Sequence, residues 1–490
     1  MTTESRHSST TKTLTMNDLN TTSLIPLNYN PSDCEVGIVH VGIGAFHRAH
    51  QAAYINELLA YKDQQKWGIL AINLRPEDTS IRTQLVAQEH LYTLKTLSPS
   101  NHSTYQRIGS ILATLDWSKT PKGAAQVLDN ENIHLLTMTV TESGYYLSEN
   151  GQLETQSPII IEALKGTGSC IYTYLRSSLN ARRLGCNLPI TLLCCDNLRD
   201  NGHYLKSGFE QFLRACNDTE LHNWVANNVT FPCCMVDRIT PRADAIHIAD
   251  VKHKLGIHDP LTIMSESYTQ WIIEDNFAGP KPDFERVGVK LVDDVSPYEN
   301  AKIRILNGGH TILSYLAALK GYKTYDQGLA DTELNRLFSA YQTTEVIPAI
   351  GESPINLIEY YQLTKARFSN SNIADAVARI CADGGIKFPI FILPTLIESY
   401  ALGHTPAHAL QGVASWYVFM LQVQSKQIEF TYIEPKWQYL EPLLDAKNPT
   451  FFIESKELWG QLPERFPQYK LQLAQAIDMM LLRFPVNHMN

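Results

Sequence analysis

The chain has 490 residues, longer than the roughly 100 to 200 residues of one ordinary domain, so its length predicts two large units. Apolar residues make up 44% and charged residues 19%, which excludes a chain that is disordered or fibrous throughout. The net charge of -9, without a clustered basic stretch, argues against binding to nucleic acid or to anionic lipid.

No apolar run approaches the roughly 18 to 20 residues that cross a bilayer, and the first thirty residues lack the apolar core of a signal peptide. We therefore expect a cytoplasmic protein without a membrane partner. Neither the nine cysteines nor the sixteen histidines show the spacing of a zinc site, so we expect no bound metal. We expect a monomer, and no coiled-coil heptads contradict that expectation.

Residues 1–30 are rich in Ser, Thr and Asn without apolar periodicity, and they predict a flexible tail. A buried strand follows from Val36, then a helical period over residues 47–61 and a second strand over residues 67–74. This order is a β-α-β unit.

Further strands are expected at residues 91–97, 134–142, 189–197 and 287–294, and helices at residues 157–181 and 203–217. Such alternation predicts a mainly parallel, doubly wound sheet. After Pro297 the strand signals fade and amphipathic helical stretches dominate. The sequence therefore predicts an α/β domain at residues 31–296 followed by a mainly α-helical domain at residues 297–490.

The first strand turns into a helix within the segment GIVHVGIGAFHRAH. Glycines there let backbone approach a pyrophosphate while the helix N-terminus stabilises its charge, so the candidate cofactor-binding residues are Gly42, Gly44, Ala45 and Phe46. His47 replaces the third glycine of the GxGxxG pattern, so helix and strand must pack in another way. The alternative is a glycine turn without a ligand.

The second strand ends in LRPED, where Glu77 and Asp78 can accept hydrogen bonds from ribose hydroxyls and repel a 2'-phosphate. These carboxylates favour NAD over NADP. Arg75 beside them leaves the opposite preference open, and a solvated loop is the alternative.

The run SPYENAKIRILNGGHTILSY predicts one helix wound at about 100° per residue. On that wheel four polar residues fall within an arc of about 140° while Arg304 points away, and these four are Glu299, Lys302, Asn307 and His310. A polar face of this kind lines a site or faces solvent.

Gly308 and Gly309 lie inside the same helix, where each costs about 1 kcal/mol in helix propensity. The pair therefore predicts that something approaches the helix backbone closely.

Six motifs occur in the order GAFHRAHQ, TVTESGYY, CCDNLRDNG, MVDRITP, WIIEDNF and KIRILNGGH. With them the chain resembles the mannitol dehydrogenase family of polyol-specific long-chain dehydrogenases over residues 36–480. The resemblance implies a Rossmann-type NAD-binding domain, a helical C-terminal domain that carries substrate-binding and catalytic residues, and no catalytic metal.

Lys302 matches the general base of the family, and Asn197 and Asn307 match the pair that hydrogen-bonds the reacting oxygen. A lysine accepts the hydroxyl proton only when burial and the cofactor's positive charge lower its pKa. Two fixed amides then stabilise the developing alkoxide, as in an oxyanion hole.

By the same resemblance, His310, Asp237, Arg379 and Lys387 hold the other substrate hydroxyls, and Glu299 relays the proton to solvent. From pattern alone Asp237 would form an ion pair with the next arginine, and Arg379 would be a surface residue. The chain departs from the family at SESYTQW (residues 265–271) and at Gly385, and both changes bear on the identity of the polyol.

The implied reaction is D-mannitol + NAD = D-fructose + NADH, with D-arabinitol and sorbitol left open as substrates. A fructuronate (hexuronate) reductase of the same superfamily is the nearest alternative, since Arg304 offers a positive charge for a carboxylate. The alternative of another class is a noncatalytic protein that senses NAD, although such a protein would not need Lys302.

Overall fold

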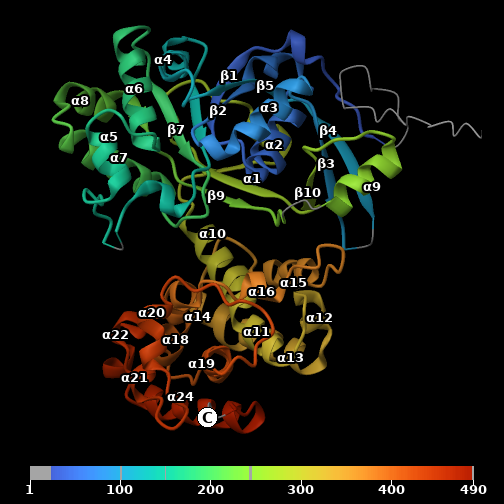
Figure 1. Cartoon of the computed structure of the whole chain (residues 1–490), viewed down its shortest axis with the longest axis vertical. Helices are drawn as coiled ribbons and strands as arrows, with labels where there is room; N and C mark the ends of the chain where they lie inside the picture. The colour runs from blue at the N-terminus through green and yellow to red at the C-terminus, as the bar shows by residue number, and fades with distance from the viewer. Residues whose placement is uncertain (1–23, 100–101, 149, 242–244, 488–490) are drawn as a thin grey trace, which may run out of the picture. The chain divides into compact units, whose positions relative to one another are not determined.

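The computed structural model describes residues 24–99, 102–148, 150–241 and 245–487. The chain forms two compact units, and the division falls between Ser296 and Pro297 (Figure 1). Most of the expected tail lies outside the described residues. Within the described part Leu24 is buried and Ile25 pairs with Gln106, so residues 24–30 pack on the first unit.

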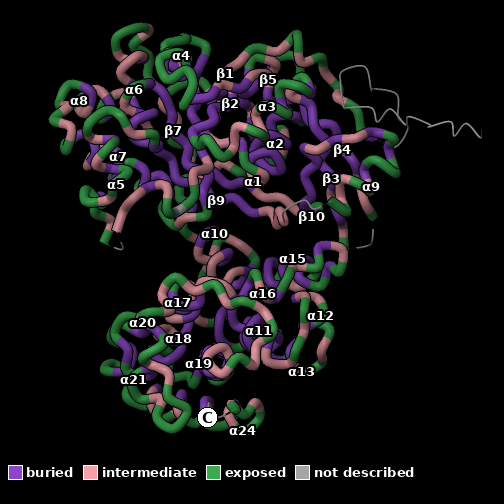
Figure 2. Tube along the Cα trace, in the orientation of Figure 1, coloured by how far each residue is buried: buried purple, intermediate pink, exposed green. Residues whose placement is uncertain are grey.

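The first unit is built on a six-stranded sheet in the order β5, β2, β1, β6, β7, β8, and all its neighbouring strands are parallel. The strands are β1 Val36–Val41, β2 Gly68–Asn73, β5 Ile111–Asp116, β6 Leu135–Met138, β7 Ile190–Cys194 and β8 Val229–Thr230. Figure 2 shows the central strands as buried. The predicted parallel sheet of a Rossmann-type domain is confirmed.

Successive residues of each strand face opposite sides of this sheet, and each side has its own core. Val39 packs in a core with side chains of α6 and α7, whereas Ile38 packs in a core with side chains of α2. Leu136 and Leu135 divide in the same way. Continuous apolar runs suit strands that are covered on both faces, so this division explains why the sheet is doubly wound.

The helices of this unit are α1 Ala45–Ala49, α2 Gln51–Leu58, α3 Thr79–Ala87, α4 Pro121–Gln126, α5 Pro158–Leu164, α6 Ile171–Leu184, α7 Asn201–Ala215, α8 Thr219–Asn228 and α9 Ala245–Leu255. Two expected helices are each divided. The expected helix at residues 47–61 breaks at His50, which has φ -114 and ψ -86. The expected helix at residues 157–181 breaks around Gly166, which has φ 80.

Two expected strands were placed in the wrong sheet. Residues 91–97 form β3 Tyr92–Leu97, which lies between β10 Ile263–Glu266 and β4 Ser103–Ile108. Residues 287–294 contain β12 Lys290–Val292, which pairs with β11 Gln270–Glu274 beside β9 Cys234–Asp237. Both belong to separate three-stranded sheets, because strand pairing is set by distant parts of the chain.

The described residues of the second unit form helices joined by loops, with one isolated bridge between Thr324 and Ala376, and they surround α11 and α19, whose side chains are mostly buried. Its helices are α10 Ser296–Ala301, α11 Gly308–Leu319, α12 Tyr325–Ala330, α13 Thr332–Ala340, α14 Ile347–Ile350, α15 Leu357–Phe368, α16 Val377–Ile380, α17 Gly384–Lys387, α18 Leu393–Ala401, α19 Ala407–Gln424, α20 Trp437–Leu440, α21 Thr450–Ile453, α22 Lys456–Trp459, α23 Leu462–Arg465 and α24 Gln468–Arg483. The predicted helical C-terminal domain is confirmed.

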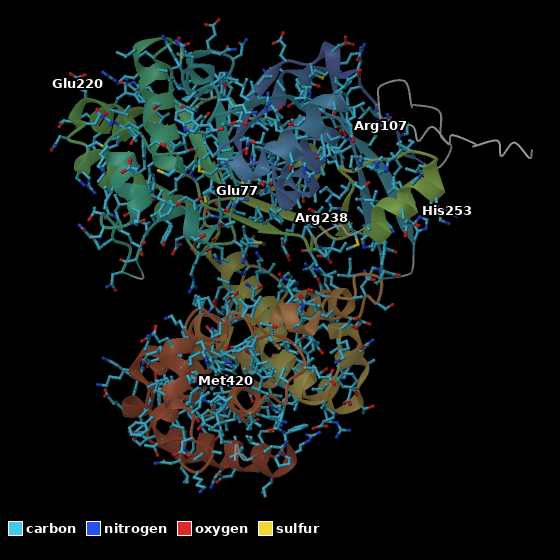
Figure 3. All side chains as sticks on the ribbon, viewed as in Figure 1. Glu77, Arg107, Glu220, Arg238, His253 and Met420 are labelled. Atoms are coloured by element: carbon cyan, nitrogen blue, oxygen red, sulfur yellow. The ribbon has the colours of Figure 1, made fainter. Side chains whose placement is uncertain are left out.

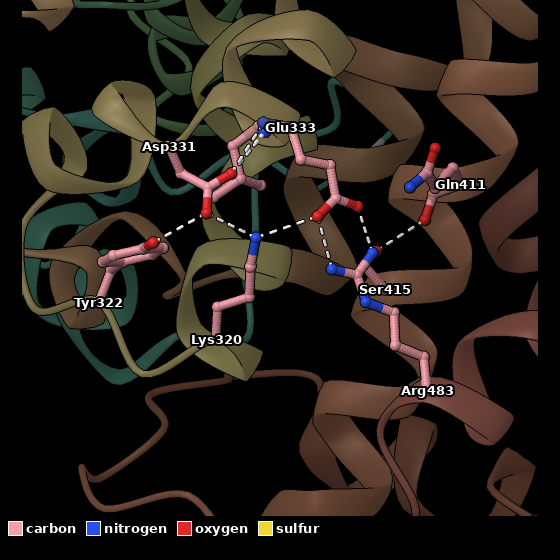
Figure 4. Close-up of polar contacts among 8 residues, drawn as sticks. Lys320, Tyr322, Asp331, Glu333, Gln411, Ser415 and Arg483 are labelled. Carbon is pink, nitrogen blue, oxygen red and sulfur yellow. Dashed lines mark hydrogen bonds and ion pairs between the residues drawn. The ribbon is translucent and has the colours of Figure 1, made fainter.

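A network of ion pairs and hydrogen bonds connects α24, the last helix, to α11 and α13 of this unit (Figure 4). Lys320, at the end of α11, donates to Asp331 at 2.6 Å and to Glu333 at 3.0 Å. Tyr322 donates to the same Asp331 carboxylate, and Arg483 of α24 donates to Glu333. Asp331 also accepts from backbone N–H groups at the start of α13, so the network supplies the N-cap of that helix.

Candidate active site

In the six-stranded sheet β6 lies between β1 and β7, and candidate residues follow β2, β1 and β7. Gly42 follows β1, Glu77 and Asp78 follow β2, and Asn197 follows β7. Because these strands are adjacent and parallel, their carboxyl ends lie along one edge of the sheet. Ligands of doubly wound sheets bind outside this edge.

The turn from β1 to α1 has the backbone that a pyrophosphate site needs. Gly42 has φ +112, and a Cβ there would lie 2.9 Å from the Thr139 carbonyl oxygen. Gly44 is the N-cap of α1, and no protein atom lies within 4 Å of the position its Cβ would take. The two glycines therefore permit a tight turn and leave open space at the start of the helix, as a bound dinucleotide requires.

Two stacked imidazole rings replace the missing third glycine. His47 of α1 is fully buried and stacks on His40 of β1, with ring centroids 3.4 Å apart. The His40 ring nitrogens lie 2.7 Å from the Thr137 hydroxyl and 3.1 Å from the Thr139 hydroxyl. Burial lowers the pKa of His47 to about 3, so the stack is uncharged. Helix and strand thus pack through flat aromatic faces rather than through a glycine.

The acidic residues after β2 differ in their surroundings. Glu77 is exposed in the short Pro76–Asp78 turn (Figure 3). Arg75 donates to the Asp78 carboxylate at 3.0 Å, so these two side chains neutralise one another. Glu77 is therefore the stronger candidate for ribose hydroxyls.

Asn197 is exposed directly after a buried carboxylate that joins two strand ends. Asp196 accepts from the backbone N–H of Thr141 at 2.8 Å and from that of Val140 at 3.1 Å. The Tyr145 hydroxyl donates to the same carboxylate at 2.5 Å. These bonds hold the segment after β6 beside the segment that carries Asn197.

Asp237 is the last residue of β9 and is buried. The next side chain, Arg238 (Figure 3), donates to the Glu266 carbonyl at 3.1 Å and to the Ala49 carbonyl. Arg238 therefore joins the end of α1 to strand β10.

In the second unit Lys302–Asn307 is a π-helical turn, η7, between α10 and α11. The expected winding of 100° per residue is wrong here, because a π-helix bonds each N–H to the carbonyl five residues earlier. Lys302 and Asn307 are five apart, so the wider turn brings them closer around the axis than an α-helix would. Lys302 is 8% exposed and Glu299, one turn earlier, is 2% exposed.

Close packing of two further π-helical segments, η8 Tyr341–Val346 and η9 Phe388–Ile392, explains the glycine pair in this helix. The buried Gln342 amide donates to the Ile305 carbonyl at 2.8 Å. A Cβ on Gly309 would lie 2.7 Å from that amide nitrogen and 2.7 Å from the Phe338 ring. The group that approaches this backbone is thus a neighbouring helix.

Arg304 is buried and has its hydrogen-bond and ion-pair partners within the second unit. Its side chain is 2% exposed, donates to the Thr395 hydroxyl at 3.0 and 3.2 Å, and forms an ion pair with Glu398. Both partners lie on α18. Arg304 thus anchors η7 to α18.

His310 stacks on Phe368 at 3.8 Å and meets the edge of Tyr325 at 4.6 Å. Burial lowers its pKa well below the ordinary value, and the positive charges of Arg379, Arg367 and Lys387 add to this effect. The imidazole is therefore neutral at physiological pH, with one nitrogen to donate and one to accept a hydrogen bond. The sequence reasoning missed the buried Arg367, which stands in none of the motifs.

Arg379 and Lys387 lie near enough to His310 for their charges to lower its pKa. Arg379 forms a bidentate ion pair with Asp375, and its Nε donates to Asp375 Oδ1 at 2.7 Å. Lys387 donates to the Ile380 carbonyl at 2.9 Å and to the Ala382 carbonyl at 2.6 Å. Both cations thus already have acceptors that fix their positions.

The departures from the family pattern differ in exposure, since Ser267 of the SESYTQW segment is exposed whereas Ser265 and Gly385 are buried. Ser265 is fully buried on β10 and donates to the Glu266 carbonyl at 3.1 Å. The Gly385 N–H donates to Glu434 at 2.9 Å, and a Cβ on Gly385 would lie 3.1 Å from the same carboxylate.

Among the described residues, no three His, Cys, Asp or Glu side chains are grouped so that they could hold a metal ion. None of the described helices has the length and apolar character to span a membrane.

Two family models match the chain. The model described as "Mannitol dehydrogenase Rossmann domain" covers residues 36–286, and that described as "Mannitol dehydrogenase C-terminal domain" covers residues 294–481.

Individual relatives cover almost the whole chain. A D-arabinitol 4-dehydrogenase of Klebsiella pneumoniae is 36% identical over 86% of this chain and 94% of its own length. The structure of Pseudomonas fluorescens mannitol 2-dehydrogenase in ternary complex with NAD and D-mannitol is 32% identical, with a TM-score of 0.85 over 96% of this chain and 97% of its own. A substrate-free D-sorbitol dehydrogenase is 28% identical, with a TM-score of 0.88 over 96% and 98%.

Proposed function

The chain belongs to the mannitol dehydrogenase family and is one of its polyol dehydrogenases, and we propose that it interconverts D-mannitol and D-fructose with NAD and with Lys302 as general base. One observation carries the proposal. The buried Lys302 shares a π turn with Asn307 in a chain that resembles, over 96% of its length, a mannitol 2-dehydrogenase bound to NAD and D-mannitol.

Gly42, Gly44, Ala45 and Phe46 would hold the pyrophosphate of NAD, since the turn leaves open space before α1. Glu77 would accept hydrogen bonds from the ribose hydroxyls and repel a 2'-phosphate. Asp78 would add negative charge there, although Arg75 offsets it. When bound, NAD supplies the acceptor for the hydride that leaves the carbinol carbon.

The second unit supplies the proton chemistry. Lys302 takes the proton of the reacting hydroxyl, a step that requires its uncharged amine. Asn307, together with Asn197 of the first unit, donates to the reacting oxygen as charge develops on it. Glu299 passes the proton from Lys302 toward solvent.

Neutral hydroxyl groups suit the remaining candidate residues. His310 is uncharged and can donate to one hydroxyl and accept from another. Arg379 and Lys387 are fixed by their own acceptors and present their remaining N–H groups, and Asp237 accepts from a hydroxyl.

Arg304 gives no support to a hexuronate as substrate, because it is buried against Glu398 and Thr395. Arg379 and Lys387 beside His310 are still cations that a carboxylate could meet, so fructuronate is one arm of the test. A protein that only senses NAD would not need the buried Lys302 beside Asn307.

D-Arabinitol is the second candidate, because a D-arabinitol 4-dehydrogenase is 36% identical to this chain. Read from its C5 end, D-arabinitol has the configuration of D-mannitol at the oxidised carbon and at the next two carbons, and it is one carbon shorter. Sorbitol read from its C6 end has the same three configurations. The configuration at the reacting end therefore does not separate these polyols, and the choice among them rests on the assay.

The test is to mix purified protein with NADH or NADPH and with D-fructose, D-xylulose or D-fructuronate, and to follow absorbance at 340 nm. We expect fructose-dependent oxidation of NADH that is lost in Lys302→Ala and kept in Lys323→Ala, which removes an exposed lysine of the same unit. Faster turnover of xylulose would move the enzyme to D-arabinitol. Turnover of fructuronate alone would contradict the polyol proposal, and absence of turnover would favour a noncatalytic role.

A further inference from the structure

Arg48 is a buried cation directly behind the turn from β1 to α1. Its side chain comes from α1 and is 5% exposed. The guanidinium Nε donates to the Ile43 carbonyl at 3.2 Å, and Nη1 donates to the Leu261 carbonyl at 2.9 Å. The Tyr92 ring lies 5.5 Å from the guanidinium, and its hydroxyl donates to the Arg48 carbonyl at 2.6 Å.

This guanidinium forms no ion pair with any carboxylate of the described residues. The acids that attract it from a greater distance, Asp259 and Asp78, have other partners. Asp259 accepts from the Thr93 N–H, and Asp78 accepts from Arg75. A buried charge without a counter-ion is costly, and an anion bound nearby would offset that cost.

The hydrogen bond to Ile43 shows where this charge acts. Ile43 stands between Gly42 and Gly44, so its carbonyl belongs to the turn itself. Arg48 holds that carbonyl by a hydrogen bond and so fixes the backbone between the two glycines. In a low-dielectric interior, a buried positive charge bonded to the turn also attracts an anion bound there.

We propose that Arg48 is a positioning residue for the cofactor pyrophosphate, holding the Gly42–Gly44 backbone through Ile43 and supplying a buried positive charge behind it; this role rests on the proposed use of NAD. The motif GAFHRAHQ contains Arg48, but the family resemblance gives this arginine no role.

Arg182 provides a matched control in the same unit. It is also fully buried and held by carbonyls, donating to Leu188 at 2.7 Å, to Leu128 at 2.7 Å and to Pro189 at 3.0 Å. Leu188 and Pro189 precede β7, so Arg182 lies at the amino ends of the strands, on the edge opposite the turn. Its loss disturbs the fold in a similar way without touching the turn.

The experiment measures the dissociation constants of NADH, ADP-ribose and adenosine for the whole protein and for Arg48→Met, Arg48→Lys and Arg182→Met. We expect Arg48→Met to weaken NADH and ADP-ribose about tenfold, equivalent to about 1.4 kcal/mol, and to change adenosine by less than twofold. The KM for NADH should rise in step while kcat at saturating NADH stays within twofold. Arg48→Lys should recover part of the affinity, since it keeps the charge but not the guanidinium fork.

Three results would overturn the role of Arg48: equal NADH affinity in Arg48→Met and wild type, the same loss in Arg182→Met, or equal weakening of ADP-ribose and adenosine. Should Arg48→Met fail to fold, the comparison of Arg48→Lys with Arg182→Lys replaces it, with the same expected order. Wild-type protein that binds no NADH would instead overturn the proposed function.

Discussion

Gly309→Ala tests the close helix packing that surrounds Lys302. Helix propensity alone predicts a gain of about 1 kcal/mol, because alanine replaces glycine within a helix. The new Cβ would lie 2.7 Å from the Gln342 amide nitrogen and 2.7 Å from the Phe338 ring, and Phe338 is fully buried. Overpacking of this kind costs about 1 to 3 kcal/mol. Displacing Gln342 from the Ile305 carbonyl costs about 1 kcal/mol more.

The net expectation is a loss of about 2 kcal/mol, which lowers the melting temperature by about 4 to 8 °C for a unit of this size. Thermal unfolding followed by circular dichroism at 222 nm measures it. Gly123→Ala is the control, because the nearest atom to its new Cβ, on Thr120, is 3.9 Å away, and it should be neutral or stabilising. A melting temperature of Gly309→Ala equal to or above wild type would refute the packing argument.

Two further predictions concern pH. Hydrogen bonding from Lys320 holds the pKa of Asp331 well below its usual range, so the stability it contributes is present above the ordinary aspartate pKa and is lost as the pH falls through the lowered value. Lys320→Met should lower the free energy of unfolding in urea by about 1 kcal/mol at pH 7, and by progressively less below pH about 4. An equal loss of stability at pH 7 and at pH 3 would contradict this. Glu345 hydrogen-bonds His408 and raises its pKa, so this stability is present below the ordinary histidine pKa and is lost as the pH rises through the raised value. Glu345→Gln should therefore destabilise by about 1 kcal/mol more at pH 5.5 than at pH 9, and a difference independent of pH would point to loss of the α19 cap alone.

Four of the six strands of the main sheet were predictable because they are short, continuous apolar runs that end at glycines or polar residues, whereas β5 and β8 were not expected. Four runs beginning near Val36, Gly68, Leu135 and Ile190 became neighbours in one parallel sheet. The run at Tyr92 looked the same but joined a separate sheet, since its partners are fixed by segments far along the chain.

The site was predictable where it depends on one segment and unpredictable where it depends on packing. The polar residues around Lys302 stood out by their spacing, yet the π turn did not, because one extra residue per turn barely alters an apolar period. Arg367 lies on α15, whereas His310 lies on α11, so only the tertiary fold places their charges near one another. The bond from Arg48 to the Ile43 carbonyl likewise depends on packing rather than on a motif.

The most direct test of the central claim follows the hydride itself. D-Mannitol carrying deuterium on its carbinol carbons is incubated with NAD and the protein, and the NADH formed is analysed by mass spectrometry. We predict one deuterium in each NADH formed by the wild type and by Lys323→Ala, and no NADH above background with Lys302→Ala. NADH formed at the wild-type rate by Lys302→Ala would contradict the assignment of Lys302, and no labelled NADH from the wild type with any polyol would contradict the proposed reaction.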